Sequence, residues 1–326
     1  MIQTVIYMGT PDFAVPPLEA IINAGYTVAA VVTQPDRPKG RHGQLCPPPV
    51  KETALLHGIP VLQPEKIRDP DSVRALRAYR PDVIVVAAFG QILPEEVLSM
   101  APYGCINIHA SLLPAYRGAA PIQWALIRGE KESGVTTMRM NKGLDTGDII
   151  QQVRVKLDPE ETGGSLFDKL SAAGSGLIIE TLRSLEEGTA RFTPQPEISP
   201  TPYAAMLRRE DGEIDWGESA VNIERRIRGL CPWPGAYTFL EDKQLKIWRA
   251  SLWSGRTEEA SEGSPEGSPQ RPGTVLRGRD GAWLVRTGEG ILELLEIQAA
   301  GKKRMEAAAF LRGKSVAAGS ILGKQR

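Results

Sequence analysis

Three polar side chains near the middle of the chain have types and spacing that suit electrostatic or acid–base chemistry. Asn107 and His109 stand two positions apart in NIHASLLPAYRGAAPIQWAL, and Asp145 lies between two glycines in MNKGLDTGDII. Because side chains alternate along a strand, Asn107 and His109 would share one face. A carboxylate from the Asp145 loop would orient the imidazole and favour its protonated form. An amide and a cationic imidazole together could stabilise an oxyanion.

Each of these residues also has a purely structural interpretation. A lone histidine at a strand end is most often a satisfied structural residue, and an aspartate between glycines is usual in turns. Asn107 could bond the neighbouring backbone, and Ser111 could cap the turn into LLPAYRG. Spacing alone therefore leaves both interpretations open, and no Ser–His–Asp nucleophile can be inferred from it.

The elements that would position these side chains alternate between strands and helices. Near-continuous apolar runs are typical of strands buried on both faces; they occupy residues 4–9, 27–33, 82–90 and 104–110. Helix patterns with Pro near the start or Gly after the end lie between them; they cover residues 15–25, 49–58 and 69–79. The alternation predicts an α/β fold with a Rossmann-like, doubly wound, mostly parallel sheet. Ligands bind beyond the carboxyl ends of such strands, which would put His109 at the mouth of a cleft.

The second half of the chain changes character. The chain of 326 residues exceeds the usual single-domain size, so two domains are expected. Residues 162–188 have the pattern of one long helix, and four prolines follow within residues 193–203. We expect a catalytic domain, a linker and a C-terminal domain of short strands; their ranges are 1–189, 190–207 and 208–326. Within the last, residues 254–273, rich in Ser, Glu, Gly and Pro, are expected to form a flexible loop.

Composition and motifs exclude several classes of protein. Hydrophobic residues make up 41% of the chain and charged residues 24%, which excludes a mainly disordered or fibrous protein. The three cysteines lack CxxC pairing, the N-terminus has no signal-peptide pattern, and no apolar run approaches the ~18 residues that span a bilayer. We therefore expect a cytoplasmic protein with no membrane partner.

Common cofactor signatures are missing as well. MGTPDFA has Thr10-Pro11 where a dinucleotide site needs glycines, and no P-loop occurs. Three scattered histidines without paired carboxylates predict no metal site. Any cofactor is expected to be organic.

Positive charge gathers at the C-terminal end. Residues 271–326 hold eleven Lys and Arg against five Asp and Glu, although the whole chain has a net charge of zero. Such an excess attracts a polyanion such as RNA in some proteins and is simply a solvated surface in others. Charge alone does not decide between them.

Longer stretches resemble one enzyme family. NIHASLLPAYRGAAPIQWALIRGEKESGVTTMRMNKGLDTGDII is similar to the core signature of the formyltransferases that use 10-formyltetrahydrofolate, in particular of those members that act on methionyl-tRNA. Further segments are similar to the same family: GTPDFAVPPLEAI, TQPDRPKGRHGQLCPPPVK, AAFGQILPEEVL and IRGLCPWPGAY. The likeness covers most of the chain and fails chiefly at residues 254–273.

The resemblance implies an activity and assigns roles by position. Asn107, His109 and Asp145 would be catalytic, in transfer of a formyl group from 10-formyltetrahydrofolate to the α-amino group of methionine on initiator tRNA. The implied folate-binding residues are Ser111, Leu112, Leu113 and Pro114, with Phe89, Gly90, Ile92 and Leu93 as a candidate apolar wall. The candidate tRNA-binding residues are Arg37, Lys39, Arg41, Lys302, Lys303 and Arg304. The C-terminal domain is expected to be an OB-like β-barrel and the protein a monomer.

Three alternatives share part of this pattern. A formyltransferase acting on a small amine would use the same three catalytic residues, but the basic segment RPKGRHG and the appended domain argue against it. A hydrolase of formyl-folate would need neither of these features. A non-catalytic RNA-binding module would give Asn107, His109 and Asp145 no shared role.

Overall fold

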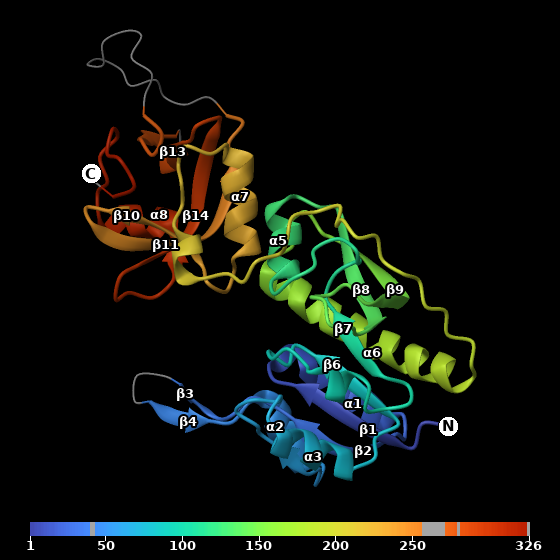
Figure 1. Ribbon diagram of the computed structural model, residues 1–326. Helices are drawn as coiled ribbons and strands as arrows, with labels where there is room; N and C mark the ends of the chain where they lie inside the picture. The colour runs from blue at the N-terminus through green and yellow to red at the C-terminus, as the bar shows by residue number, and fades with distance from the viewer. Residues whose placement is uncertain (40–42, 256–270, 279–280, 325–326) are drawn as a thin grey trace. The chain divides into compact units, whose positions relative to one another are not determined.

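The computed structural model describes residues 1–39, 43–255, 271–278 and 281–324, which form two compact units (Figure 1). The first unit comprises Met1–Pro121, Lys131–Leu157 and Leu166–Ala205, and the second comprises Ile122–Glu130, Asp158–Ser165 and Met206–Arg326. Most of the expected loop 254–273 lies outside the described residues. The segment 190–205, expected as part of a linker, is grouped with the first unit.

The first unit is built on a seven-stranded sheet in the order β5-β2-β1-β6-β7-β8-β9. Five strands are parallel: β1 (Thr4–Gly9), β2 (Thr27–Val32), β5 (Val61–Leu62), β6 (Val83–Ala87) and β7 (Cys105–His109). Two strands that the sequence did not reveal, β8 (Glu132–Arg139) and β9 (Asp148–Lys156), continue the sheet antiparallel. The predicted Rossmann-like, mostly parallel sheet is confirmed.

Helices connect the parallel strands, as their sequence signals predict. They are α1 (Val15–Asn23) after the short 3-10 turn Asp12–Ala14, α2 (Pro49–Leu56), α3 (Pro70–Ala78) and α4 (Glu95–Leu98), of which α4 was not predicted from the sequence. The long α6 (Gly163–Glu186), which the sequence did predict, follows β9. Proline stands in the first turn of α1, α2 and α3, where its missing N–H costs no hydrogen bond. Alternate side chains of β1, β2 and β6 enter one apolar core with α3 and α4. A β-carbon at Gly174 of α6 would lie 3.0 Å from Ile108 Cγ2, so glycine there permits close packing of α6 on β7.

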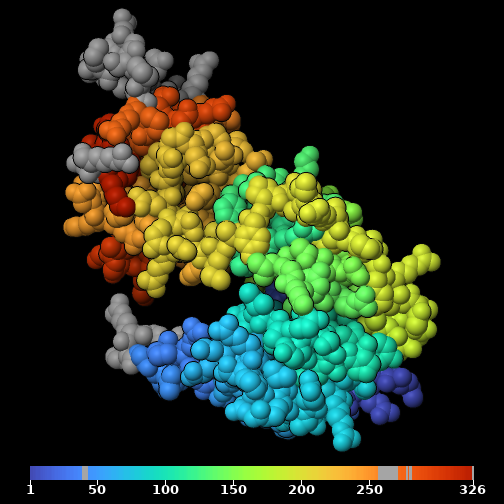
Figure 2. Space-filling view, viewed as in Figure 1, coloured from blue at the N-terminus to red at the C-terminus, as the bar shows by residue number. Residues whose placement is uncertain are grey.

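A small hairpin extends the loop after β2. Its strands are β3 (Arg37–Lys39) and β4 (Gln44–Cys46), and Figure 2 shows the described hairpin residues, in blue, standing out from the body of the first unit. At its base the Lys51 ammonium donates to both carboxylate oxygens of Asp36 at 2.9 Å, and Gln63 donates to Asp36 Oδ1 at 2.7 Å. These donors lower the pKa of Asp36, Gln63 contributing most, and so keep the carboxylate ionised.

The second unit contains an antiparallel six-stranded sheet, and the expected C-terminal β-domain is confirmed as a curled half-barrel. The path β10-β11-β14-β13-β12 is joined by β15 on β14. These strands are β10 (Ala236–Leu240), β11 (Lys243–Leu252), β12 (Val275–Arg277), β13 (Trp283–Arg286), β14 (Ile291–Ala299) and β15 (Met305–Glu306). The helices are α7 (Ala220–Gly229), α8 (Ala307–Gly313), the 3-10 turn Arg209–Gly212 and, from Ile122 onward, α5 (Pro121–Ile127). Alternate residues of the strands fill a core around Trp283.

Within the described part of the chain, none of the helices has both the length and the apolar character needed to cross a bilayer.

Candidate active site

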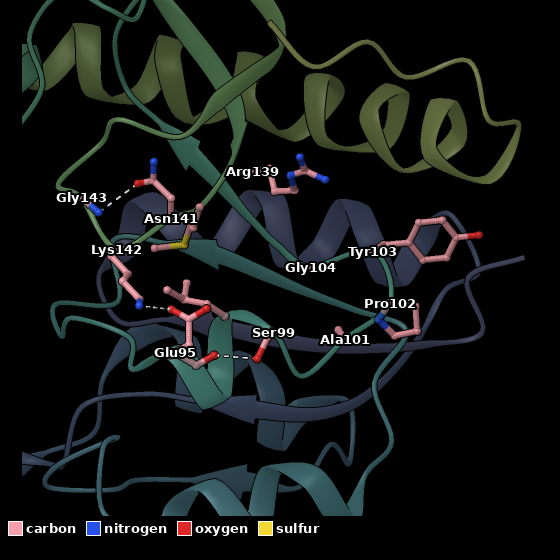
Figure 3. Close-up of a pocket in the computed structure, with 12 residues that line it drawn as sticks. Glu95, Ser99, Ala101, Pro102, Tyr103, Gly104, Arg139, Asn141, Lys142 and Gly143 are labelled. Carbon is pink, nitrogen blue, oxygen red and sulfur yellow. Dashed lines mark hydrogen bonds and ion pairs between the residues drawn. The ribbon is translucent and has the colours of Figure 1, made fainter. Parts of the chain in front are cut away.

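A cavity of about 540 Å³ opens in the first unit beside the loop that carries Asp145 (Figure 3). One wall is α4 and the residues after it, and the other is formed by residues 139–143. Its rim carries two cations that have partners: Lys142 lies 3.2 Å from the Glu95 carboxylate, and Arg139 lies 3.3 Å from Asp148. None of the residues predicted to bind folate lines this cavity.

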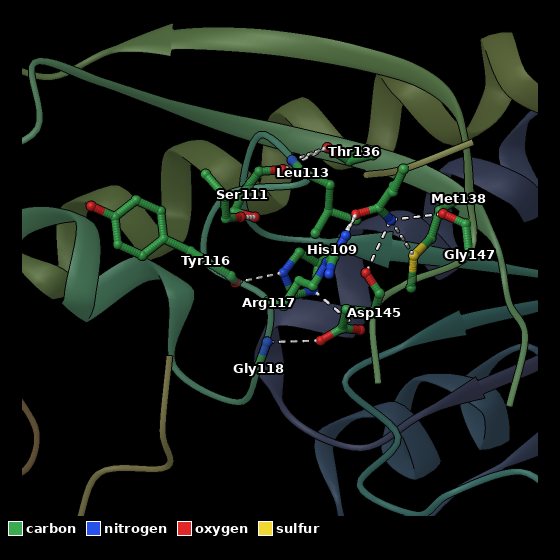
Figure 4. Close-up of polar contacts among 12 residues, drawn as sticks. His109, Ser111, Leu113, Tyr116, Arg117, Gly118, Thr136, Met138, Asp145 and Gly147 are labelled. Atoms are coloured by element: carbon green, nitrogen blue, oxygen red, sulfur yellow. Dashed lines mark hydrogen bonds and ion pairs between the residues drawn. The ribbon is translucent and has the colours of Figure 1, made fainter. Parts of the chain in front are cut away.

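His109 is the last residue of β7 and is almost completely buried, with 6% of its surface exposed. Its Nε2 lies 3.0 Å from the backbone oxygen of Tyr116 (Figure 4). Because a carbonyl oxygen can only accept, Nε2 is the nitrogen that donates in this contact. Nδ1 therefore faces Asp145, whose Oδ1 lies 3.7 Å away. That separation is too long for a hydrogen bond. An imidazole with hydrogen on both ring nitrogens would be attracted to the carboxylate at this distance.

Asp145 has its other carboxylate oxygen anchored. Oδ2 accepts a hydrogen bond of 2.9 Å from the backbone N–H of Gly118, which follows the Tyr116 turn. The backbone of Asp145 has φ +55°, in the left-handed region that side chains other than Asn and Asp enter rarely. The structure thus brings His109 Nδ1 and the Asp145 carboxylate within 3.7 Å of each other, without a hydrogen bond between them.

Asn107 lies two residues before His109 on β7 and points to the same face of the sheet. It is buried, with 8% of its surface exposed, and no hydrogen bond joins its side-chain amide to another described residue. A buried amide without such a bond is a donor available to a bound group.

The segment 111–114 forms a tight turn directly after His109. Ser111 donates from Oγ to the Ala115 carbonyl at 2.6 Å, and the Leu113 N–H donates to Thr136 Oγ1 at 3.0 Å. Ser111 and Leu113 are buried, whereas Leu112 and Pro114 are half-buried. The Ser111 hydroxyl caps the turn, which is the structural interpretation that the sequence had left open.

The four residues predicted to form an apolar wall, Phe89, Gly90, Ile92 and Leu93, follow β6. Their side chains differ in exposure. Phe89 and Leu93 are buried in the core beneath the sheet edge, at 2% and 4% exposure. Ile92 is 74% exposed, and Gly90 makes the turn with φ +87°. Of these four residues, Ile92 is the one that offers apolar side-chain surface to a ligand.

The predicted tRNA-binding residues occupy two places. Arg37 is exposed on β3 and Lys39 ends the same strand, while Arg41 lies outside the described residues. Lys302 and Lys303 are exposed in the turn between β14 and β15. Arg304 pairs with the Glu296 carboxylate and stacks over Trp248 at 5.0 Å from the ring centre, so its charge is partly neutralised within the unit.

Two residues around the site were not identified from the sequence. Arg117 is buried at 7% exposure, and its guanidinium donates to Gln195 Oε1 from both Nε and Nη2, at 3.1 and 2.9 Å. Gln195 in turn donates from Nε2 to the backbone oxygens of Asp145 and Gly147, at 3.0 and 2.7 Å. Their positions, in a Gly-containing turn and a Pro-rich segment, gave no signal of this network. Among the described residues, no cluster of three His, Cys, Asp or Glu side chains could hold a metal.

Two protein-family models match this chain. The Formyl transferase family model matches residues 3–182, and the model of the Formyl transferase C-terminal domain matches residues 206–315. Two solved structures share the fold. They are the N-formyltransferase from Helicobacter canadensis in complex with folinic acid and dTDP-3-aminofucose, and HypX from Aquifex aeolicus in complex with tetrahydrofolic acid.

The first of these structures has a TM-score of 0.62 at 19% identity and covers 92% of this chain and 100% of its own. The second has a TM-score of 0.57 at 19% identity and covers 95% of this chain and 47% of its own. At these identities the likeness establishes the fold alone.

A curated relative is much more similar. The methionyl-tRNA formyltransferase of Agathobacter rectalis is 53% identical over 317 residues, which is 97% of this chain and 98% of the relative. A second, from Lachnospira eligens, is 52% identical over 98% of this chain and 99% of its own. The chain belongs to the methionyl-tRNA formyltransferase family.

Proposed function

We propose that this chain transfers the formyl group of 10-formyltetrahydrofolate to the free α-amino group of methionine esterified to initiator tRNA. The observation that carries the proposal is the identity of 53% to a methionyl-tRNA formyltransferase across nearly the whole of both chains. The site geometry supports it, because Asn107, His109 and Asp145 gather at the carboxyl edge of the sheet.

The first step is nucleophilic attack. The neutral α-amine of methionine attacks the formyl carbon, a C–N bond forms, and the carbonyl electron pair moves to oxygen. Asn107 supplies an amide donor to that oxygen, and the imidazole of His109 supplies a second donor from Nδ1 when both ring nitrogens carry hydrogen. Asp145, 3.7 Å from Nδ1, stabilises the resulting positive charge, while the Tyr116 carbonyl holds the ring through Nε2.

The second step is collapse of the tetrahedral intermediate. The bond from the formyl carbon to folate N10 breaks, and the electron pair goes to N10. The attacking nitrogen loses one proton and N10 gains one, so the exchange balances. A water beside the Asp145 carboxylate is our candidate for carrying the proton between them.

The folate would lie at the edge formed by the ends of β6 and β7. Ile92 offers it apolar surface, and the turn 111–114 fixes the backbone beside His109. The cavity beside residues 139–143 adds space, and its rim carries Arg139 and Lys142, each already paired with a carboxylate, which an anionic part of a ligand would have to displace. The donor therefore has an apolar and a charged surface available in the same unit.

The tRNA would be held by positive charge. Arg37 and Lys39 stand on the hairpin after β2, and Lys302 and Lys303 stand exposed in the β14–β15 turn. Phosphate contacts from such side chains position a nucleic acid without reading its sequence.

The test is an acceptor-specificity assay with the purified chain and 10-formyltetrahydrofolate. Initiator methionyl-tRNA is expected to be formylated, with elongator methionyl-tRNA and an amino-sugar nucleotide as control acceptors. Preferential formylation of the amino-sugar nucleotide, or release of formate with no acceptor requirement, would contradict the proposal.

A further inference from the structure

Residues 193–204, which we call the strap, form hydrogen bonds to the Asp145 loop and to the Tyr116 turn, which lie on either side of the His109 imidazole. We propose that the strap positions His109 for catalysis. The strap belongs to the first unit and begins with two backbone hydrogen bonds between Thr193 and Ile149. In Figure 2 the strap, yellow-green to yellow, lies at the surface of this unit. The inference rests on the proposed function, since it assigns a role in that same reaction.

One side of the strap holds the Asp145 loop. The Gln195 amide donates to Asp145 O at 3.0 Å and to Gly147 O at 2.7 Å, so its two bonds fall on Asp145 itself and on the second residue after it. A left-handed backbone such as that of Asp145, at φ +55°, persists only where its surroundings hold it. Gln195 supplies that restraint, and with it the placement of the carboxylate next to His109.

The other side of the strap holds the Tyr116 turn. Tyr116 also has a left-handed backbone, with φ +57°, and its N–H donates to Thr201 Oγ1 at 2.7 Å. Ser199 donates from Oγ to the Pro114 carbonyl at 2.9 Å. The Tyr116 carbonyl is the acceptor of His109 Nε2. Both groups that face the imidazole, this carbonyl and the Asp145 carboxylate, are therefore fixed from the strap.

Arg117 ties the two sides together. Besides its paired bonds to Gln195 Oε1, the guanidinium donates to the carbonyls of Pro196 at 2.7 Å and Glu197 at 3.2 Å. The backbone oxygen of Arg117 also accepts from the N–H of Ala204 at 2.8 Å. The planar, charged guanidinium makes several hydrogen bonds to neutral acceptors at once and so holds them rigidly. The single ammonium of a lysine could not make the same set of bonds.

Gln195 and Arg117 are thus positioning residues, since neither touches the groups that would react. We expect the two residues to act on the reaction only through the placement of Asp145. A general role in stability would not predict the following pattern. Loss of the Gln195 amide should lower kcat and leave the KM values for both substrates unchanged. It should have little effect once the Asp145 carboxylate is already removed.

The experiment measures kcat and both KM values for formylation of initiator methionyl-tRNA by the full chain. Gln195→Met keeps the length of the side chain and removes its donors. We expect kcat to fall by about 100-fold, the scale of a 1 Å misplacement of a catalytic group, with KM changed by less than about 3-fold. The matched control is Glu197→Gln, an exposed side chain on the same strap, which should keep kcat within about 2-fold of wild type.

A double-mutant cycle with Asp145→Asn separates positioning from general stability. In the Asp145→Asn background, Gln195→Met should change kcat by less than about 3-fold, because the carboxylate that it positions is already absent. A full 100-fold loss in that background, or an unchanged kcat for Gln195→Met alone, would overturn the inference.

If Gln195→Met does not fold, Gln195→Glu decides the question. Its carboxylate still pairs with Arg117 but cannot donate to the Asp145 and Gly147 carbonyls, so the same loss of kcat is expected and wild-type kcat would refute the role. Failure of the wild-type chain to formylate methionyl-tRNA would instead refute the proposed function itself.

Discussion

At the scale of single residues, the site depends on where hydrogen-bond donors and charges stand relative to His109. The sequence could place Asn107 and His109 on one face of a strand end, because strand periodicity and the carboxyl-edge rule need no other information. It could also offer Asp145 as a partner. It could not reveal Tyr116 as the acceptor of Nε2, since that contact depends on a left-handed turn that no residue type announced.

The buried Arg117 shows the same limit more strongly. Arginine is rarely buried without a partner, and its partner Gln195 lies 78 residues away in a segment whose prolines indicated a simple linker. Only the folded chain brings the two together. The pattern of residues in one sequence therefore cannot predict that a buried arginine is held by neutral acceptors far away in the chain.

Asn107 gives a prediction at this scale. Asn107→Ala removes a donor aimed at the oxyanion, so kcat should fall by about 100- to 1,000-fold. Folding should be little affected, because the amide makes no hydrogen bond to other described residues. Steady-state formylation and thermal melting would be measured together, with the exposed Asn23→Ala as the control. Wild-type turnover in Asn107→Ala would remove Asn107 from the mechanism.

At the scale of elements, the parallel strands and helices were predictable and the shorter pieces were not. The runs at β1, β2, β6 and β7 are mostly apolar because both faces of the sheet are covered, and the polar Asn107 and His109 stand at the carboxyl end of β7. No strand was predicted for the hairpin of β3 and β4, since each strand has three residues and one contains Pro38. The antiparallel strands β8 and β9 contain adjacent polar residues, Thr136–Thr137 and Gln151–Gln152, that interrupt any sustained apolar run.

A variant at Gly118 tests how closely the strap approaches the turn at Tyr116. Its φ is +126°, and a β-carbon there would lie 2.6 Å from the Ala204 oxygen. Gly118→Ala should therefore lower the free energy of unfolding by about 1–3 kcal/mol and reduce formylation. Gly176→Ala is the matched control: in α6 its β-carbon meets nothing within 4 Å, so a gain of about 0.5–1 kcal/mol is expected. Equal stability of the two variants in chemical denaturation would contradict this packing.

The Glu296–Arg304 pair links β14 to the turn before β15 and makes stability depend on pH. A hydrogen bond from Arg304 lowers the pKa of Glu296 from its ordinary 4.5 in the folded state. A lowered folded-state pKa contributes stability that is present above pH 4.5 and is lost as pH falls through the folded-state value. The melting temperature of wild type should exceed that of Glu296→Gln at pH 7, and the difference should shrink in acid. A difference that stays constant from pH 7 to about pH 3 would contradict the linkage.

At the scale of the whole molecule, the sequence indicated most directly that an α/β unit comes first along the chain and a β-rich unit comes second. A parallel sheet with its site at the carboxyl edge is followed by an antiparallel domain with a C-terminal excess of positive charge. The fold alone does not select the acceptor, because the Helicobacter canadensis structure shares it in complex with an amino-sugar nucleotide. The similarity to methionyl-tRNA formyltransferases over nearly the whole chain indicates methionyl-tRNA as the acceptor.

The exposed lysines of the β14–β15 turn give a prediction about salt. If Lys302 and Lys303 contact phosphates, replacing both with alanine should weaken tRNA binding and reduce the slope of log affinity against log salt concentration by about 1 to 2. The KM for the folate donor should not change. Lys156→Ala, an exposed lysine at the end of β9, serves as the control. An unchanged slope would exclude these lysines from the tRNA-binding surface.

The most direct test of the account is the rate of a single turnover of formyl transfer to initiator methionyl-tRNA by His109→Ala. Because the imidazole is the donor that Asp145 and Tyr116 hold in place, the rate should fall by at least about 100- to 1,000-fold while the melting transition is retained. His57→Ala, which removes a half-exposed histidine paired with Glu19, should react at the wild-type rate. A folded His109→Ala variant that transfers the formyl group within about 3-fold of the wild-type rate would contradict the account.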